Sequence, residues 1–159
     1  MRIKNILDSG DVVRSHCAPV KDKQLLSSHH WETAVILEHI YPECSKALLF
    51  YALTHDTAEL FTGDLPATIK MDSPVIKHSL DSLEHMYESQ RLGIHRPTFS
   101  DVEMLAVKWA DVISGIYFTR KRIEQGDRLA SPVLSNWMDY ANNLPHLNQA
   151  ARTAVGEVQ

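Results

Sequence analysis

Apolar residues recur along the chain at the spacing of helical turns, whereas the strict alternation typical of strands is hard to find. In residues 28–41, Ala34, Leu37 and Ile40 fall among polar positions, and Pro42 is expected to end the helix. The same reasoning predicts further helices over residues 43–62, 72–90, 100–124, 132–142 and 147–155. The pattern therefore predicts an all-α fold, a bundle of about five to seven helices.

Residues at the expected helix ends support these boundaries. Gly63 and Pro66 follow the second helix, as is usual beyond a C-terminus. Pro74 falls in the first turn of the third helix, where a missing N–H costs nothing. Ser100 and Glu103 form a Ser-x-x-Glu capping box at the start of the fourth helix.

Length and charge narrow the class of protein. The chain has 159 residues and a formal net charge of −4, which suits one domain over residues 1–159 because domains hold about 100–200 residues. A mildly acidic chain is not expected to bind nucleic-acid polymers, since that requires a basic face. No apolar run reaches membrane-spanning length, and the first residues lack a signal-peptide core. Cys17 and Cys44 form no disulfide pattern, so we expect a cytoplasmic protein.

Ionisable residues interrupt three of the apolar segments. His55 and Asp56 directly follow the apolar run of the second helix, Asp111 lies inside the fourth, and His30 precedes the apolar turn of the first. A buried charge needs a partner or a metal ion. Two imidazoles and two carboxylates suit Zn²⁺, Co²⁺, Mn²⁺ or Fe²⁺ better than Mg²⁺. We therefore predict a divalent metal site formed by His30, His55, Asp56 and Asp111.

Less specific interpretations apply to each residue taken singly. A His/Glu pair four residues apart, such as His55 and Glu59, is common on solvated helix faces, and one buried Asp can simply cap a neighbouring helix. The joint occurrence on three apolar segments favours the metal site. His29 is expected to project from another helix face than His30. It is then either a neighbour of the metal site or a ligand of a second ion. The remaining histidines need no function, apart from His16.

The order of His30, His55-Asp56 and Asp111 along the chain resembles that of the metal ligands in the HD-domain phosphohydrolases. Residues 52–66 contain His55-Asp-x-x-Glu59-x-x-x-Gly-Asp64-Leu-Pro66, which is similar to the signature of the 5′-deoxynucleotidases and of related phage-type deoxynucleotide triphosphohydrolases. The twelve-residue pattern is far more specific than a bare His-Asp pair. The likeness covers residues 12–120 or so, and Lys108-x-Ala-Asp111 resembles the final ligand segment.

The resemblance assigns roles residue by residue. It implies that His30, His55, Asp56 and Asp111 hold the metal and that Glu59 is the catalytic residue. Arg14 resembles an arginine that contacts phosphate. The expected substrate-binding residues are Arg14, His16, Asp64, Leu65, Pro66, Ala67 and Lys70.

Three positions depart from the family pattern. Ser15 stands where the family has a tryptophan that stacks on the base, and His16 is a candidate for part of that role. Thr68 replaces a second proline, and His29-His30-Trp31 replaces Glu-His-Ser at the first ligand. The preference for a particular base is therefore the family property that is least safely assigned to this chain.

The resemblance implies hydrolysis of the 5′-phosphoester of (2′-deoxy)nucleotides, releasing a nucleoside plus phosphate or triphosphate. It also implies a homo-oligomer, a dimer or higher, working in the cytoplasm, or in the host cytoplasm if the chain is phage-encoded. The alternative is a catalytically degenerate HD domain that senses a nucleotide or a metal. Glu59 argues against it, because a sensor has no evident use for the catalytic carboxylate.

Overall fold

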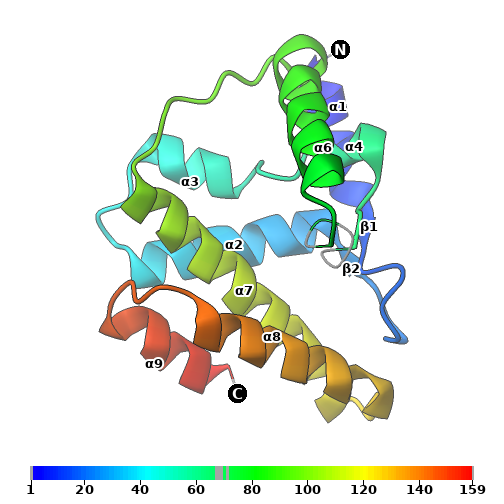
Figure 1. Cartoon of the computed structure of the whole chain (residues 1–159), viewed down its shortest axis with the longest axis vertical. Coiled ribbons are helices and arrows are strands. Elements are labelled where there is room, and N and C mark those ends of the chain that lie inside the picture. The colour runs from blue at the N-terminus through cyan, green and yellow to red at the C-terminus, as the bar shows by residue number, and fades with distance from the viewer. Residues whose placement is uncertain (1, 67–69, 71, 159) are drawn as a thin grey trace.

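The longest helix, α7 (Asp101–Glu124), crosses the molecule and packs along α2 (Leu26–Ile40), as Figure 1 shows. The computed structural model describes residues 2–66, 70 and 72–158. Helices α8 (Ser131–Asn143) and α9 (Gln149–Glu157) both pack against α7. Of these four helices, α2 and α7 carry His30 and Asp111 of the predicted site.

Shorter elements complete the described part of the chain. They are α1 (Arg2–Asp8), the 3-10 turn η1 (Ser9–Asp11), strands β1 (Val13–Arg14) and β2 (Gln24–Leu25), α3 (Lys46–Ala52), α4 (Glu59–Thr62), α6 (Pro74–Tyr87), the π-helical turn η2 (Glu88–Leu92) and the 3-10 turn η3 (Arg128–Ala130). The strands pair antiparallel, with Arg14 opposite Gln24. The all-α class is confirmed, since these two-residue strands are the whole sheet content of the described residues.

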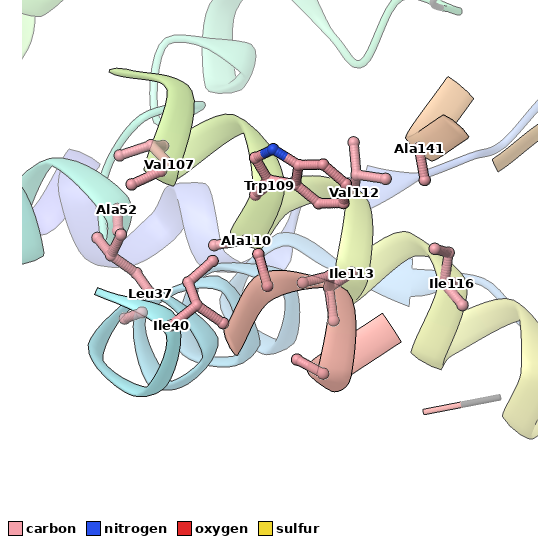
Figure 2. Close-up of a cluster of buried hydrophobic side chains, with 14 of the residues drawn as sticks. Leu37, Ile40, Ala52, Val107, Trp109, Ala110, Val112, Ile113, Ile116 and Ala141 are labelled. Carbon is pink, nitrogen blue, oxygen red and sulfur yellow. The ribbon is translucent and has the colours of Figure 1, made fainter. Parts of the chain in front are cut away.

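The core lies where α2, α3, α7, α8 and α9 meet (Figure 2). Leu37 and Ile40 of α2 and Ile113 and Ile116 of α7 all belong to this cluster, and all four are fully buried. Each such side chain contributes about 1.5–3 kcal/mol relative to exposure. The apolar positions that predicted the helices are thus the ones that hold α2 against α7.

One glycine brings two helices into close approach. A Cβ atom on Gly115 of α7 would lie 2.6 Å from the Trp137 ring of α8. The missing side chain therefore makes room for the indole.

Several helix boundaries match the expectations. The Ser100 side chain accepts from the backbone of Glu103, and the reciprocal bond completes the capping box of α7. Helix α6 begins at Pro74 with Ser73 as its cap. The third helix, predicted over residues 72–90, continues from α6 into η2, which ends before Gly93 in the left-handed conformation with φ 69°.

The helix predicted over residues 43–62 is wrong as a single element, because it breaks between α3 and α4. Residues 53–58 form consecutive tight turns, in which Thr54 N donates to Tyr51 O and Thr57 N to Thr54 O. The Thr54 hydroxyl donates to Phe50 O at 2.6 Å, and such local bonds compete with helical ones. The His-Asp pair therefore lies in a turn and not on a helix face.

The sequence reasoning also missed α1 and the strand pair. Helix α1 has no buried residue, so it carries no core-facing apolar stripe. The strands are two residues long, too short for an alternating pattern. Within the described residues, none of the helices combines the length and hydropathy needed to cross a membrane.

Candidate metal centre

Three segments bring histidine and aspartate side chains to one place. His29 and His30 come from the first turns of α2, His55 and Asp56 from the turn between α3 and α4, and Asp111 from the middle of α7. The packing of α2 against α7 sets the distance between His29 and Asp111. The two groups of possible metal ligands found in the described residues both lie here.

Four ligand atoms have the separations that one ion requires. His29 Nε2 lies 3.2 Å from His55 Nε2, 3.4 Å from Asp111 Oδ1 and 3.8 Å from Asp56 Oδ2. His55 Nε2 lies 3.3 Å from Asp56 Oδ2. Ligands about 2.0–2.2 Å from a tetrahedral Zn²⁺ are separated by roughly 3.4 Å. The residues present therefore fit a divalent ion.

The predicted set of His30, His55, Asp56 and Asp111 is divided between the two groups. One group is His29, His55 and Asp111, and the other is His30, His55 and Asp56. His30 Nε2 accepts a hydrogen bond from the backbone N of Asp56 at 3.3 Å, so its lone pair is already used in a hydrogen bond to the turn at residues 53–58. Both histidine rings reach His55, with centroids 5.2 Å (His29) and 5.1 Å (His30) from it. His29, expected near the site or as a ligand of a second ion, thus lies in one of the two candidate ligand groups.

Burial holds His29 and His30 in the neutral form that binds a metal. Burial lowers the pKa of His29 well below its usual value, and Arg14 lowers it further. Burial and the neighbouring His55 lower the pKa of His30 to about 3. The Nδ1 atom of His55 lies 2.9 Å from Ala52 O, which can only accept, so Nδ1 carries the proton and Nε2 offers its lone pair.

The two aspartates are ionised. Burial by itself raises the pKa of Asp56, but His55 and Arg14 lower it below its usual range. Burial likewise raises the pKa of Asp111, but the positive charges of Lys108 and Arg14 act against this effect, and the pKa lies below its usual range. Arg14 Nη2 lies 3.5 Å from Asp56 Oδ2, and Lys108 Nζ lies 2.8 Å from Asp111 Oδ2. The cluster thus combines the neutral imidazoles of His29 and His30 with two anionic carboxylates.

Glu59 is a buried carboxyl group beside this cluster. It begins α4, its residue is 4% exposed, and its Oε2 has no hydrogen-bond partner among the described residues. Burial and then the charge of Asp56 raise the pKa of Glu59 to about 9, against the influence of Arg14. A buried polar atom without a partner is costly, so this oxygen is available to a substrate or a water.

The predicted substrate-binding residues border the cluster to different extents. The backbone N of Ser15, in the left-handed region with φ 55°, donates to Asp64 Oδ2 at 2.6 Å, and His16 Nδ1 lies 3.8 Å from the same oxygen. Leu65 and Pro66 are half-buried. Ala67, like Thr68, lies outside the described residues. Lys70 acts on the site through its charge, which opposes the raised pKa of Glu59.

Arg96 is a residue of this region that the sequence did not reveal. Its guanidinium donates to Thr54 O at 2.6 Å, forms a short ion pair with Glu88 and lies over the Tyr51 ring at 4.5 Å. It thereby holds the turn that carries His55. No sequence signal pointed to it, because 42 residues separate Arg96 from Thr54.

Comparison with solved structures shows the fold of an HD phosphohydrolase. The chain superposes on the HD phosphohydrolase DatZ of cyanophage S-2L, solved bound to dA and one catalytic Zn²⁺ ion, with a TM-score of 0.77. That match has 18% identity and covers 97% of this chain and 91% of DatZ. A protein of Pyrococcus horikoshii matches with a TM-score of 0.70 and 15% identity over 99% of this chain and 96% of its own.

Residues 22–102 match the model of the YfbR-like 5′-deoxynucleotidases, and the chain belongs to this family. A 5′-deoxynucleotidase of Pasteurella multocida is 29% identical over an alignment of 103 residues, and the match covers 57% of this chain. The chain matches about half the length of that curated relative, 51%. The family assignment agrees with the resemblance carried by residues 52–66.

Proposed function

We propose that this protein is a metal-dependent phosphohydrolase that cleaves the 5′-phosphoester of 2′-deoxynucleotides. The observation that carries the proposal is the set of four ligand atoms, 3.2–3.8 Å apart, beside a buried carboxyl group with an oxygen free of partners. The family membership supports the same activity. A nucleotide or metal sensor would not need Glu59, so the catalytic alternative is favoured.

The metal is held by His29, His55, Asp56 and Asp111 in this proposal. His29 takes the place first given to His30, since the Asp111 carboxylate lies 3.4 Å from His29 Nε2. The ion, when bound, supplies a Lewis acid for a phosphoryl oxygen and lowers the pKa of water. The mixed nitrogen and oxygen ligands suit Zn²⁺, Co²⁺, Mn²⁺ or Fe²⁺. The Zn²⁺ ion of DatZ favours zinc among these.

Glu59 is the residue that moves a proton. Hydrolysis breaks the bond between phosphorus and the 5′-oxygen, a water oxygen bonds to phosphorus, and the 5′-oxygen receives a proton. With a pKa raised to about 9, the Glu59 carboxyl holds a proton near neutral pH in the metal-free protein. Its free Oε2 is the atom through which it can donate that proton or orient the water.

Arg14 and the 64–67 segment bind the nucleotide. The buried Nε of Arg14 has no hydrogen-bond partner within the described residues, so the guanidinium can donate to phosphate oxygens. Asp64 accepts a sugar hydroxyl and crowds an additional 2′-hydroxyl. His16, Leu65, Pro66, Ala67 and Lys70 complete the proposed contacts.

The pairing of basic side chains around the site favours a nucleoside monophosphate over a triphosphate as the substrate. Lys108 is paired with Asp111 and Arg96 with Glu88, so neither is free for a phosphate tail. Among the predicted substrate-binding residues, Lys70 and the unpartnered Nε of Arg14 are left for that task, although Arg14 Nη2 lies 3.5 Å from Asp56 Oδ2. The triphosphohydrolase reaction, with release of triphosphate, is the competing possibility.

A substrate panel tests the proposal. Zinc-, manganese- or cobalt-loaded protein is incubated with deoxy- and ribonucleoside mono- and triphosphates, and products are separated by chromatography. We expect deoxynucleoside and inorganic phosphate from the deoxynucleoside monophosphates. Release of triphosphate would assign the competing reaction, and nucleotide binding without turnover would support the sensor.

A homo-oligomer in the cytoplasm is the proposed state. Large apolar side chains are exposed on or beside α2 and α3, namely Trp31, Val35, Phe50 and Leu53, and they can be covered by a second copy. Cys17 and Cys44 are free thiols, which suits a reducing compartment. Sedimentation of the purified protein measures the order of the oligomer, a dimer or higher.

A further inference from the structure

A buried chain of hydrogen bonds leads away from the proposed metal ligand His29. His29 Nδ1 lies 3.1 Å from Ser114 Oγ on α7, and the Ser114 hydroxyl donates to Glu32 Oε2 on α2 at 2.8 Å. His29 and Ser114 are fully buried. These hydrogen bonds therefore cross the interface between α2 and α7 twice, and they end at the half-buried Glu32.

The direction of these bonds fixes the proton on His29. A carboxylate only accepts, so the single hydroxyl proton of Ser114 goes to Glu32. The Ser114 oxygen can then only accept from His29, and Nδ1 must carry the ring proton. The lone pair of Nε2 is left facing His55, Asp56 and Asp111.

Glu32 is itself held in place from a third element. Gln24 Nε2 of β2 donates to the same Glu32 Oε2 at 2.7 Å. Gln24 is also the strand partner of Arg14, the residue beside Asp56. Burial raises the pKa of Glu32, and the hydrogen bonds from Ser114 and Gln24 act against this shift because they favour the ionised carboxylate.

We propose that Glu32, acting through Ser114, is a positioning residue that sets the tautomer and orientation of His29 for metal binding. This inference rests on the proposed function only for the identity of the ion that His29 binds. Groups that hold the far nitrogen of a ligating histidine commonly change metal affinity by about 10–100-fold. The sequence gives no indication of the link, since Glu32 and Ser114 are 82 residues apart.

Zinc affinity and the histidine tautomer test the proposal together. Zn²⁺ binding to the full chain is measured by competition with a chromogenic chelator, and the His29 tautomer of the metal-free protein by ¹⁵N NMR. We expect wild type to carry the proton on Nδ1. Glu32→Gln and Ser114→Ala should each weaken Zn²⁺ binding about 10–100-fold. Glu38→Gln, an exposed position on the same helix, is the matched control and should bind as wild type does.

The double variant separates positioning from general destabilisation. If Glu32 acts through Ser114, adding Glu32→Gln to Ser114→Ala should cause no further loss of Zn²⁺ affinity, because coupled residues are not additive. Additive losses, wild-type affinity in Glu32→Gln, or a proton on Nε2 of His29 in wild type would each overturn the proposal. If Ser114→Ala fails to fold, the Zn²⁺ affinity of Glu32→Gln and the ¹⁵N NMR spectrum of wild type still test the proposal.

The two proposals fail separately. Protein that binds Zn²⁺ but hydrolyses no nucleotide would contradict the proposed function and leave the positioning role standing. The tautomer needs neither ion nor substrate, so the NMR measurement decides the role of Glu32 in either case.

Discussion

At the scale of single residues, Glu59 and the neighbouring histidines carry the proposed chemistry. Glu59 combines burial, a raised pKa of about 9 and an oxygen without a partner in the described residues. The adjacent His29 and His30 differ in what their Nε2 atoms contact. That of His29 faces His55 and Asp111, whereas that of His30 accepts from the backbone of Asp56.

Glu59→Gln should lower turnover about 10²–10⁴-fold, because the amide keeps the shape of the side chain and cannot transfer the proton. Zn²⁺ content should stay near that of wild type, as measured by elemental analysis. Glu43→Gln, an exposed glutamate outside the site, is the control. Full turnover in zinc-loaded Glu59→Gln would remove Glu59 from the catalytic role.

His29→Ala should weaken Zn²⁺ binding by more than the roughly 100-fold typical of changes around a metal site, because a ligand itself is lost. Asp111→Ala should behave in the same way. His30→Ala should retain the ion more tightly than either variant. Chelator competition measures all three affinities, and the reverse ranking of the histidine variants would return His30 to the ligand set.

At the scale of elements, the site depends on a helix that breaks and on two helices that approach closely. The turn at residues 53–58 directs His55 and Asp56 toward the site. Two hydrogen bonds hold it, one that Arg96 donates to the Thr54 carbonyl and one that His30 accepts from the Asp56 N–H. The approach of α7 and α8 depends on Gly115 beneath Trp137. Predicting α7 from sequence succeeded, since its apolar stripe and capping box are local. Predicting the turn failed, since its stabilising partners lie far away in the chain.

Gly115→Ala should destabilise the protein by about 1–3 kcal/mol, since the new methyl group would overlap the rigid Trp137 ring. Gly156→Ala on α9 is the matched change, because a Cβ there meets nothing within 4 Å. It should stabilise by about 0.4–1 kcal/mol through the unfolded state. Urea unfolding of both variants gives the two free energies, and equal values would contradict the close packing of α7 and α8.

At the scale of the whole molecule, burying histidines makes stability depend on pH. The unfolded chain binds protons at its histidines below a pH of about 6.5, while the folded protein keeps His29 and His30 neutral to lower pH. The free energy of unfolding contributed by these rings therefore falls as the pH falls from 6.5 toward 3. Glu59, with its raised pKa, acts in the opposite direction above its unfolded pKa.

Comparing wild type with His30→Gln isolates one ring, because Glu59 is common to both. Between pH 7 and pH 5, metal-free wild type should lose about 2 kcal/mol more unfolding free energy than the variant. Urea unfolding in the presence of a chelator measures the difference. His78→Gln, at an exposed position, should follow the wild-type curve. Parallel curves for wild type and His30→Gln would show that burial does not hold His30 neutral.

The sequence by itself determined the helical class, the long helices and the residue types of the site. These features depend on local patterns: helical spacing, capping residues and the motif that includes His55, Asp56, Glu59 and Asp64. Tertiary structure alone decided which of two adjacent histidines meets Asp111, because that depends on how α2 packs against α7. It also decided the break before His55 and the link from His29 through Ser114 to Glu32. Each of these involves partners far apart in the chain, and spacing along a sequence carries no information about such contacts.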